Sequence, residues 1–196
     1  MPKGDTLTKN KIASIINNIE EAFMIVWLDG TCGVGKSTVA KELNKKIGNK
    51  SNVFDPDMIL VECPTILLGG GVKSQNNIRF LKKCQEEIQE LHESDRILII
   101  PMALTETNAK SELLEYFEKE EHIHIILSAS RAILESRIKG DQNRDKKFAL
   151  NETDGNMFFL RKYYPNDIVI DTDNKCVKDI ANEVYRYIEQ NSHAEK

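Results

Sequence analysis

One stretch of the sequence decides the fold: Gly30-Thr31-Cys32-Gly33-Val34-Gly35-Lys36-Ser37. It satisfies the pattern G-x-x-x-x-G-K-[ST]. The apolar run 24–29 precedes it and predicts a buried strand, and the segment 38–47 follows it with the periodicity of a helix. Glycine lets the backbone turn closely enough for several N–H groups to point at one anion, and a helix N-terminus adds partial positive charge. The stretch therefore predicts a loop that binds phosphate groups.

The residues of this loop have distinct expected roles. We expect Lys36 to bridge the outer phosphates of a nucleoside triphosphate, and Ser37 to ligate Mg²⁺. A glycine loop that only joins a strand to a helix is the alternative, but the Lys-Ser pair between a strand and a helix favours phosphate binding. The expected nucleotide contacts in this part of the chain are Gly30, Thr31, Cys32, Gly33, Val34, Gly35, Lys36, Ser37 and Thr38.

Apolar, β-branched runs recur along the chain and predict the rest of the fold. Besides the run that precedes the loop, they lie at 52–55, 97–101, 122–128 and 167–171. Segments with helical periodicity separate them. Because parallel strands need long crossover connections, this alternation predicts an α/β fold of three layers, a parallel five-stranded sheet with helices on both faces.

Composition limits the possible functions. A chain of 196 residues with 40% hydrophobic and 30% charged residues suits one compact domain. The net charge of −4, without a basic stripe, argues against a nucleic-acid partner. The longest apolar run, 23–28, is too short to span a membrane, and the N-terminal segment lacks the apolar stretch and small-residue cleavage site typical of a signal peptide. Four cysteines without zinc-ligand spacing fit reduced thiols, so we expect a cytoplasmic protein.

The chain divides into three expected parts. Apolar residues at three- and four-residue intervals from Leu7 to Phe23 predict an accessory helix within residues 1–23. Residues 24–190 form the domain, and 191–196 a tail. Within the domain, 62–75 and 140–165 are rich in polar residues and contain glycine, and we expect both to be irregular and mobile, with a lid at about 138–165.

A pair of carboxylates follows the second predicted strand, in Asp55-Pro56-Asp57. Ligands of open α/β sheets bind beyond the carboxyl ends of the strands, so Asp55 and Asp57 are candidates for chemistry. One would complete the Mg²⁺ shell and the other would accept a proton from a hydroxyl acceptor, and the two roles can be exchanged. The alternative is helix capping, since Asp followed by Pro suits a helix start.

Basic residues supply further candidates for binding the transferred group. Arg137 and Arg144 lie in and after a helical segment that follows the fourth strand, where arginines of a lid would clamp the triphosphate. Arg79, with Lys73 before it, could face the acceptor. Ordinary solvated side chains are the alternative.

The third predicted strand ends in Pro101-Met102, where many ATPases have an acidic residue for Mg²⁺. This argues against a motor-type ATPase. Asn174-Lys175-Cys176-Val177 lacks the aspartate with which GTPases read guanine, so a GTPase is also disfavoured.

With these motifs the chain resembles the nucleoside- and shikimate-kinase-like branch of P-loop proteins, and within it the tunicamycin-resistance ATP-binding protein family. The resemblance covers most of residues 24–186. It is carried by Ile25-Val26-Trp27-Leu28-Asp29-Gly30, Val53-Phe54-Asp55-Pro56-Asp57, Ile97-Leu98-Ile99-Ile100-Pro101-Met102 and Ile170-Asp171-Thr172-Asp173-Asn174. The chain departs from the family in one motif, because it has Asp55-Pro56-Asp57 where the family has Asp-Pro-Glu.

The resemblance implies ATP binding and a sheet of strand order 2-3-1-4-5. It also implies that adenine packs near the loop after the fifth strand, at Thr172 and Asp173, and that the ligand is a nucleoside-like antibiotic. We therefore expect a kinase that moves the γ-phosphoryl group of Mg-ATP to a small hydroxyl compound, with Lys36, Asp55, Asp57 and Arg144 in the catalytic centre. The alternative is a resistance protein that binds ATP and sequesters a ligand without phosphoryl transfer.

Overall fold

The computed structural model describes residues 23–67, 73–91, 97–142 and 145–191. The expected N-terminal helix, Arg144 and all of the expected tail except Asn191 lie outside these residues. In chain order the elements are β1 (Met24–Asp29), α2 (Lys36–Ile47), β2 (Ser51–Val53), α3 (Asp57–Glu62), η1 (Pro64–Leu67), η2 (Ser74–Asn76), α4 (Ile78–Leu91), β3 (Ile97–Pro101), α5 (Thr107–Ala109), η3 (Lys110–Glu115), β4 (Glu121–Ser128), α6 (Arg131–Gly140), α7 (Lys146–Tyr163), β5 (Ile168–Asp171) and α8 (Val177–Asn191).

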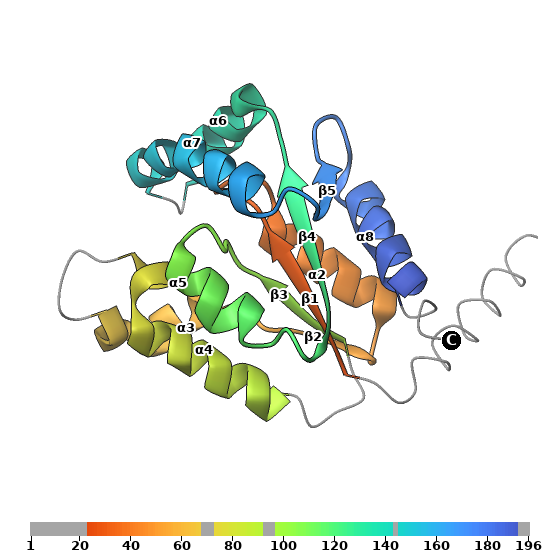
Figure 1. The fold of residues 1–196 in the computed structure, drawn as a ribbon. Coiled ribbons are helices and arrows are strands. Elements are labelled where there is room, and N and C mark those ends of the chain that lie inside the picture. Colours follow the sequence, from red (N-terminus) through yellow and green to blue (C-terminus); the bar gives the residue numbers. More distant parts are fainter. Residues whose placement is uncertain (1–22, 68–72, 92–96, 143–144, 192–196) are drawn as a thin grey trace, which may run out of the picture.

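The sheet has five strands in the order β2-β3-β1-β4-β5. Every strand pair is parallel, and β1 lies in the middle, with Met24 opposite Ile97 of β3 and Glu121 of β4. Figure 1 shows the strands running through the centre of the molecule between the helices. The parallel sheet and its strand order, both expected from the sequence, are confirmed.

Side chains of β1 alternate between two hydrophobic cores, because successive residues of a strand point to opposite faces. Val26 and Leu28 pack in the core under α2 and α8. Ile25 and Trp27 pack in the core under α4 and the C-terminal end of α7. All six β1 residues are buried, as a strand covered on both faces requires. The centre of the sheet is therefore a rigid base for the loop that follows β1.

The expectation of an irregular segment at 140–165 is wrong for most of its length, because α7 is a regular helix. Asp145 caps its start by accepting a hydrogen bond from the N–H of Phe148 at 3.0 Å. A stripe of Ala149, Thr153, Asn156 and Leu160 is buried, at helical spacing. Two of these residues are polar, which concealed the stripe; Thr153 satisfies its hydroxyl by donating to the carbonyl of Ala149.

Candidate functional site

The glycine loop connects β1 directly to α2. Gly30 and Gly33 have φ values of 139° and 80°, which side-chain-bearing residues rarely adopt. A Cβ on Gly30 would lie 2.5 Å from the carbonyl oxygen of Leu127, and one on Gly33 would lie 2.8 Å from Ile138 Cγ1. These glycines therefore let the loop pack against β4 and α6 while its N–H groups remain at the helix start.

Lys36 lies over the loop that precedes it. Its ammonium group donates hydrogen bonds to the carbonyl oxygens of Gly30, at 2.6 Å, and Thr31, at 3.2 Å. Such contacts position a cation at the N-terminus of α2, where the helix dipole also favours an anion. A phosphate group bound there would replace carbonyl oxygens as the acceptor for Lys36.

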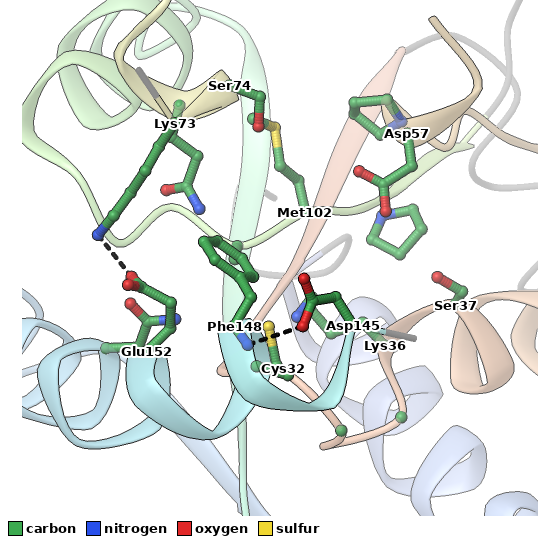
Figure 2. Close-up of a pocket in the computed structure, with 18 of the residues that line it drawn as sticks. Cys32, Lys36, Ser37, Asp57, Lys73, Ser74, Met102, Asp145, Phe148 and Glu152 are labelled. Atoms are coloured by element: carbon green, nitrogen blue, oxygen red, sulfur yellow. Dashed lines mark hydrogen bonds and ion pairs between the residues drawn. The ribbon is translucent and has the colours of Figure 1, made fainter. Parts of the chain in front are cut away.

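A cavity of about 430 Å³ begins at this loop. Six of the nucleotide contacts expected from the sequence line it, namely Cys32, Gly33, Gly35, Lys36, Ser37 and Thr38. The other three expected in the loop, Gly30, Thr31 and Val34, do not line the cavity, and the side chains of Thr31 and Val34 are buried. Figure 2 shows Lys36 and Ser37 at one end of the cavity, with Asp57 on the same side, and Lys73 and Glu152 at the opposite end.

The two candidate carboxylates take different positions. Asp57 is the first residue of α3 and lines the cavity. Asp55 is not in the cavity wall; its Oδ1 accepts a hydrogen bond from the N–H of Asp57 at 3.2 Å. Asp55 thus fixes the start of α3, although Pro56 and not Asp55 occupies the capping position. The structure therefore brings Asp57, and not Asp55, to the cavity wall, on the same side as Ser37 (Figure 2).

The hydroxyl of Ser37 and the carboxylate of Asp57 are hard oxygen donors, which suit Mg²⁺. Mg²⁺ commonly binds through one or two carboxylates together with substrate phosphates, so it does not need a complete protein cage. In the described part of the chain, no cluster of three or more His, Cys, Asp or Glu side chains could hold a metal. Of the two oxygen donors, Ser37 would hold the ion beside a triphosphate, and Asp57 is the carboxylate on the same side of the cavity (Figure 2).

Arg137 connects the glycine loop to the loop after β5. Its guanidinium group donates to the carbonyl oxygens of Val34, at 3.3 Å, and Thr172, at 3.1 Å, and to the hydroxyl of Thr172 at 3.0 Å. Because Arg137 is half-buried and lines the cavity, it does not behave as a solvated surface side chain. Thr172 itself is buried and, like Asp173, does not line the cavity.

Arg79 is not brought to the cavity, although the sequence made it a candidate for the acceptor. It is exposed on α4 and is absent from the cavity wall. Lys73, which precedes it, lines the cavity instead. The side chain of Asn77 caps α4 by accepting hydrogen bonds from the N–H groups of Arg79 and Phe80, and this turn directs Phe80 inward.

Sequence reasoning missed the residues of the wall opposite the glycine loop. Phe148, Glu152 and Asn156 line the cavity from α7, and their spacing of four residues is the signal that places them on one helix face. Lys73 forms ion pairs with Glu106, at 2.6 Å, and Glu152, at 2.5 Å. These hydrogen bonds to Glu106 and Glu152 raise the pKa of Lys73, so the ammonium form persists.

A buried polar network supports the loop from beneath. His124 Nε2 lies 3.1 Å from Asp29 Oδ2, and His124 Nδ1 lies 2.7 Å from Asp167 Oδ2. Burial acts to lower the pKa of His124, but the hydrogen bonds to Asp167 and Asp29 outweigh burial and raise it to about 9. Both ring nitrogens therefore donate, and His124 is an imidazolium at neutral pH.

This network also fixes the residue that enters the glycine loop. Asp29 Oδ1 accepts hydrogen bonds from the N–H groups of Gly30, at 2.5 Å, and Leu104, at 2.9 Å. The hydroxyl of Tyr164 donates to the carbonyl of Leu104 at 2.9 Å, and its ring packs edge-on against His124. β1, β4 and the end of α7 are thereby joined under the phosphate-binding loop.

The sheet order, the loop after its central strand and the adjoining cavity together define the fold of P-loop small-molecule kinases. The tunicamycin resistance protein of Deinococcus radiodurans has this fold, with 20% identity and a TM-score of 0.67 over 84% of this chain and 94% of that chain. Shikimate kinase from Acinetobacter baumannii in complex with shikimate gives 19% identity and a TM-score of 0.60, over 90% and 98%.

The APS kinase CysC of Mycobacterium tuberculosis, in complex with AMPPNP and APS, gives 15% identity and a TM-score of 0.64, over 86% of this chain and 98% of that chain. No protein-family model and no curated protein sequence matches the chain. At these identities the likeness establishes a shared fold. Across the described residues, the structure contains no helix both long and apolar enough to cross a membrane.

Proposed function

We propose that this protein binds ATP with Mg²⁺ and transfers the γ-phosphoryl group to a hydroxyl of a small molecule. The observation that carries the proposal is a single cavity whose one end is the Lys36-Ser37 loop and whose wall includes the carboxylate of Asp57. Solved kinases of this fold support it, one of them in complex with AMPPNP and APS. The reaction would occur in the cytoplasm, where ATP is available.

The proposed transfer uses the groups that line the cavity. The acceptor oxygen attacks the γ-phosphorus, the bond from that phosphorus to the β-γ bridging oxygen breaks, and ADP leaves. Asp57 accepts the proton from the acceptor hydroxyl. Lys36 and Arg137 balance the charge that spreads over the transferred group, and Ser37 would hold Mg²⁺, which when bound would draw electron density from the phosphate oxygens.

A second candidate is a protein that binds ATP and sequesters its ligand unmodified. Two observations favour it: Pro101 and Met102 lie in the cavity wall where other P-loop proteins carry an acid, and a tunicamycin resistance protein shares the fold. In that case nucleotide binding drives closure over the ligand and no phosphoryl group moves. The ligand would be a nucleoside-type antibiotic.

Mass spectrometry separates the two candidates. The protein is incubated with Mg-ATP and a panel of nucleosides, nucleoside antibiotics including tunicamycin, aminoglycosides and sugars, with Lys36→Ala as the control. A gain of one phosphate that the variant abolishes supports a kinase. No gain with any compound, together with ATP binding that Lys36→Ala removes, supports the sequestering protein and refutes phosphoryl transfer to these acceptors.

Two matched aspartate variants test the role of the base. We expect Asp57→Asn to lower turnover by about 10²–10⁴-fold with nearly unchanged AMPPNP affinity, because general bases contribute on that scale. Asp55→Asn keeps an oxygen that can accept the hydrogen bond from the N–H of Asp57, so it should retain most activity. Full activity of Asp57→Asn would exclude Asp57 as the base.

A further inference from the structure

The end of the cavity that lies away from the glycine loop has its own chemical character. We call it the acceptor end and define it by Lys73, Ser74, Gln75, Met102, Phe148, Glu152 and Asn156. Figure 2 shows Lys73 and Glu152 facing each other across an ion pair, with Met102 and Phe148 between this pair and Lys36. A phosphoryl acceptor bound beside the γ-phosphate would contact these side chains.

The positive charge of the acceptor end is already neutralised by protein carboxylates. Lys73 is its cation, and Glu106 and Glu152 both lie within ion-pair distance of the ammonium group, at 2.6 and 2.5 Å. Asn76 donates a further hydrogen bond to Glu106 Oε2 at 3.0 Å, which fixes that carboxylate. Because one cation is shared by two carboxylates, Lys73, Glu106 and Glu152 together carry a net negative charge.

Glu152 is the carboxylate of this group that lines the cavity. A carboxylate has about four lone-pair positions, and Lys73 uses only part of this capacity. Glu152 can therefore still accept hydrogen bonds from hydroxyl or ammonium groups of a ligand. An anionic ligand at the same place would meet like charge, which binding sites use to reject wrong partners.

The remaining side chains of the acceptor end are apolar or neutral. Met102 and Phe148 offer apolar surface for one face of a ring, and Asn156 and Ser74 offer neutral polar groups. Gln75 Oε1 accepts a hydrogen bond from the N–H of Thr105 at 2.8 Å, which orients its amide. Pockets of this composition use the apolar surface for affinity and a few fixed polar groups for orientation.

We propose that the acceptor end takes a polyhydroxylated ring compound without negative charge, either neutral or amine-bearing, and that Glu152 determines this specificity by accepting hydrogen bonds from it. The proposal rests on the proposed function in that it names the acceptor of the same site. It separates this protein from a kinase for a carboxylate acceptor, because the described residues of the acceptor end hold no cation that is free of a carboxylate partner.

The test measures binding before it measures transfer. Ring compounds are used in sets of three that differ only in charge, such as glucose, glucosamine and glucuronate, with methyl shikimate and shikimate as a further neutral and anionic pair. Binding is measured by saturation-transfer NMR with AMPPNP and Mg²⁺ present. Neutral and amine members should bind at least about tenfold more tightly than their carboxylates, because a carboxylate at this end would meet the like charge of Glu152.

A matched pair of variants assigns the effect to Glu152. Glu152→Gln should reduce the preference for amines over carboxylates by about tenfold or more. Lys73 keeps its ion pair with Glu106 in this variant, so the fold should be preserved. Glu183→Gln removes a glutamate that pairs with Lys175 and lies outside the cavity wall, and it should change nothing. Unchanged thermal unfolding and AMPPNP affinity would show that Glu152→Gln is folded.

Several outcomes would overturn the proposal. Carboxylates that bind as tightly as their neutral partners would refute it, and so would neutral and amine members that all fail to bind. If the Glu152→Gln variant keeps the preference for amines, Glu152 does not determine the ligand specificity. Ligand binding without any phosphate transfer would instead refute only the kinase function, so the two failures are distinguishable.

Discussion

Raising the pH from about 6 to about 9.5 should remove about 3 kcal/mol of folding free energy through one residue, His124. In the folded protein, the carboxylates of Asp167 and Asp29 outweigh burial and raise the pKa of His124 from 6.5 to about 9. One pKa unit corresponds to about 1.4 kcal/mol, so this rise is worth about 3 kcal/mol. The imidazole is buried, so solvent does little to screen the effect.

The direction in which stability changes with pH follows from the raised pKa of His124. The folded protein binds the proton more tightly than the unfolded chain, so the stabilisation is complete below about pH 6.5 and is lost as the pH rises through about 9. Above that pH, the neutral ring can donate only one hydrogen bond, and one of the two carboxylates loses its partner. The loss should therefore be reversible on return to lower pH.

Urea unfolding at several pH values measures the effect. Trp27 is the single tryptophan of the chain and is 1% exposed, so its fluorescence reports on the centre of the sheet. His124→Gln should lower stability at pH 6 and flatten its dependence on pH. The matched control is His122→Gln, two residues earlier on β4, where Nδ1 faces the carbonyl of Glu120. A wild-type protein equally stable at both pH values, or a His122 variant that flattens the curve as much, would refute the reasoning.

Two further predictions concern the backbone around the loop. Gly30→Ala should cost about 2 kcal/mol or more, because its Cβ would lie 2.5 Å from a backbone oxygen and φ is 139°. Gly48→Ala is the control, because Gly48 also has a positive φ but an added Cβ would meet no atom within 4 Å; it should cost only about 1 kcal/mol by urea unfolding. Equal losses of stability in the Gly30 and Gly48 variants would contradict the packing argument. Tyr164→Phe should cost about 1–3 kcal/mol by thermal unfolding, because it leaves the buried carbonyl of Leu104 without its donor. Tyr163→Phe, at the neighbouring exposed residue that ends α7, is the control and should be neutral.

Much of the fold could be predicted because the central strands β1, β3 and β4 are largely buried on both faces. Such strands are short, continuous apolar runs, and the five runs in the sequence correspond to the five strands of the sheet. The helix α7 was missed because its buried stripe contains Thr153 and Asn156, and Gly155 lies in the middle of it. Its N-terminal cap, Asp145, was present in the sequence but lay among many other polar residues.

The site was predictable only where its residues are close in sequence. The glycine loop is one continuous motif, so a pattern can identify it. The acceptor end depends on the ion pairs of Lys73 with Glu106 and Glu152. These pairs join three segments that are distant in the sequence, so no local sequence pattern indicates them. Asp55 and Asp57 could not be told apart from the sequence, because the turn at Pro56 decides which of them faces the cavity.

The central position of β1 has a consequence for the growing chain during translation. The loop sequence is complete once Ser37 has been made, but its flanking strands end at Pro101 and Ser128, and Arg137 lies later still. Pairings between segments so far apart form slowly and only after both have left the ribosome. We therefore expect nascent chains to acquire nucleotide affinity abruptly, after α6 emerges, and chains stalled before β4 to carry the loop without the walls that shape it.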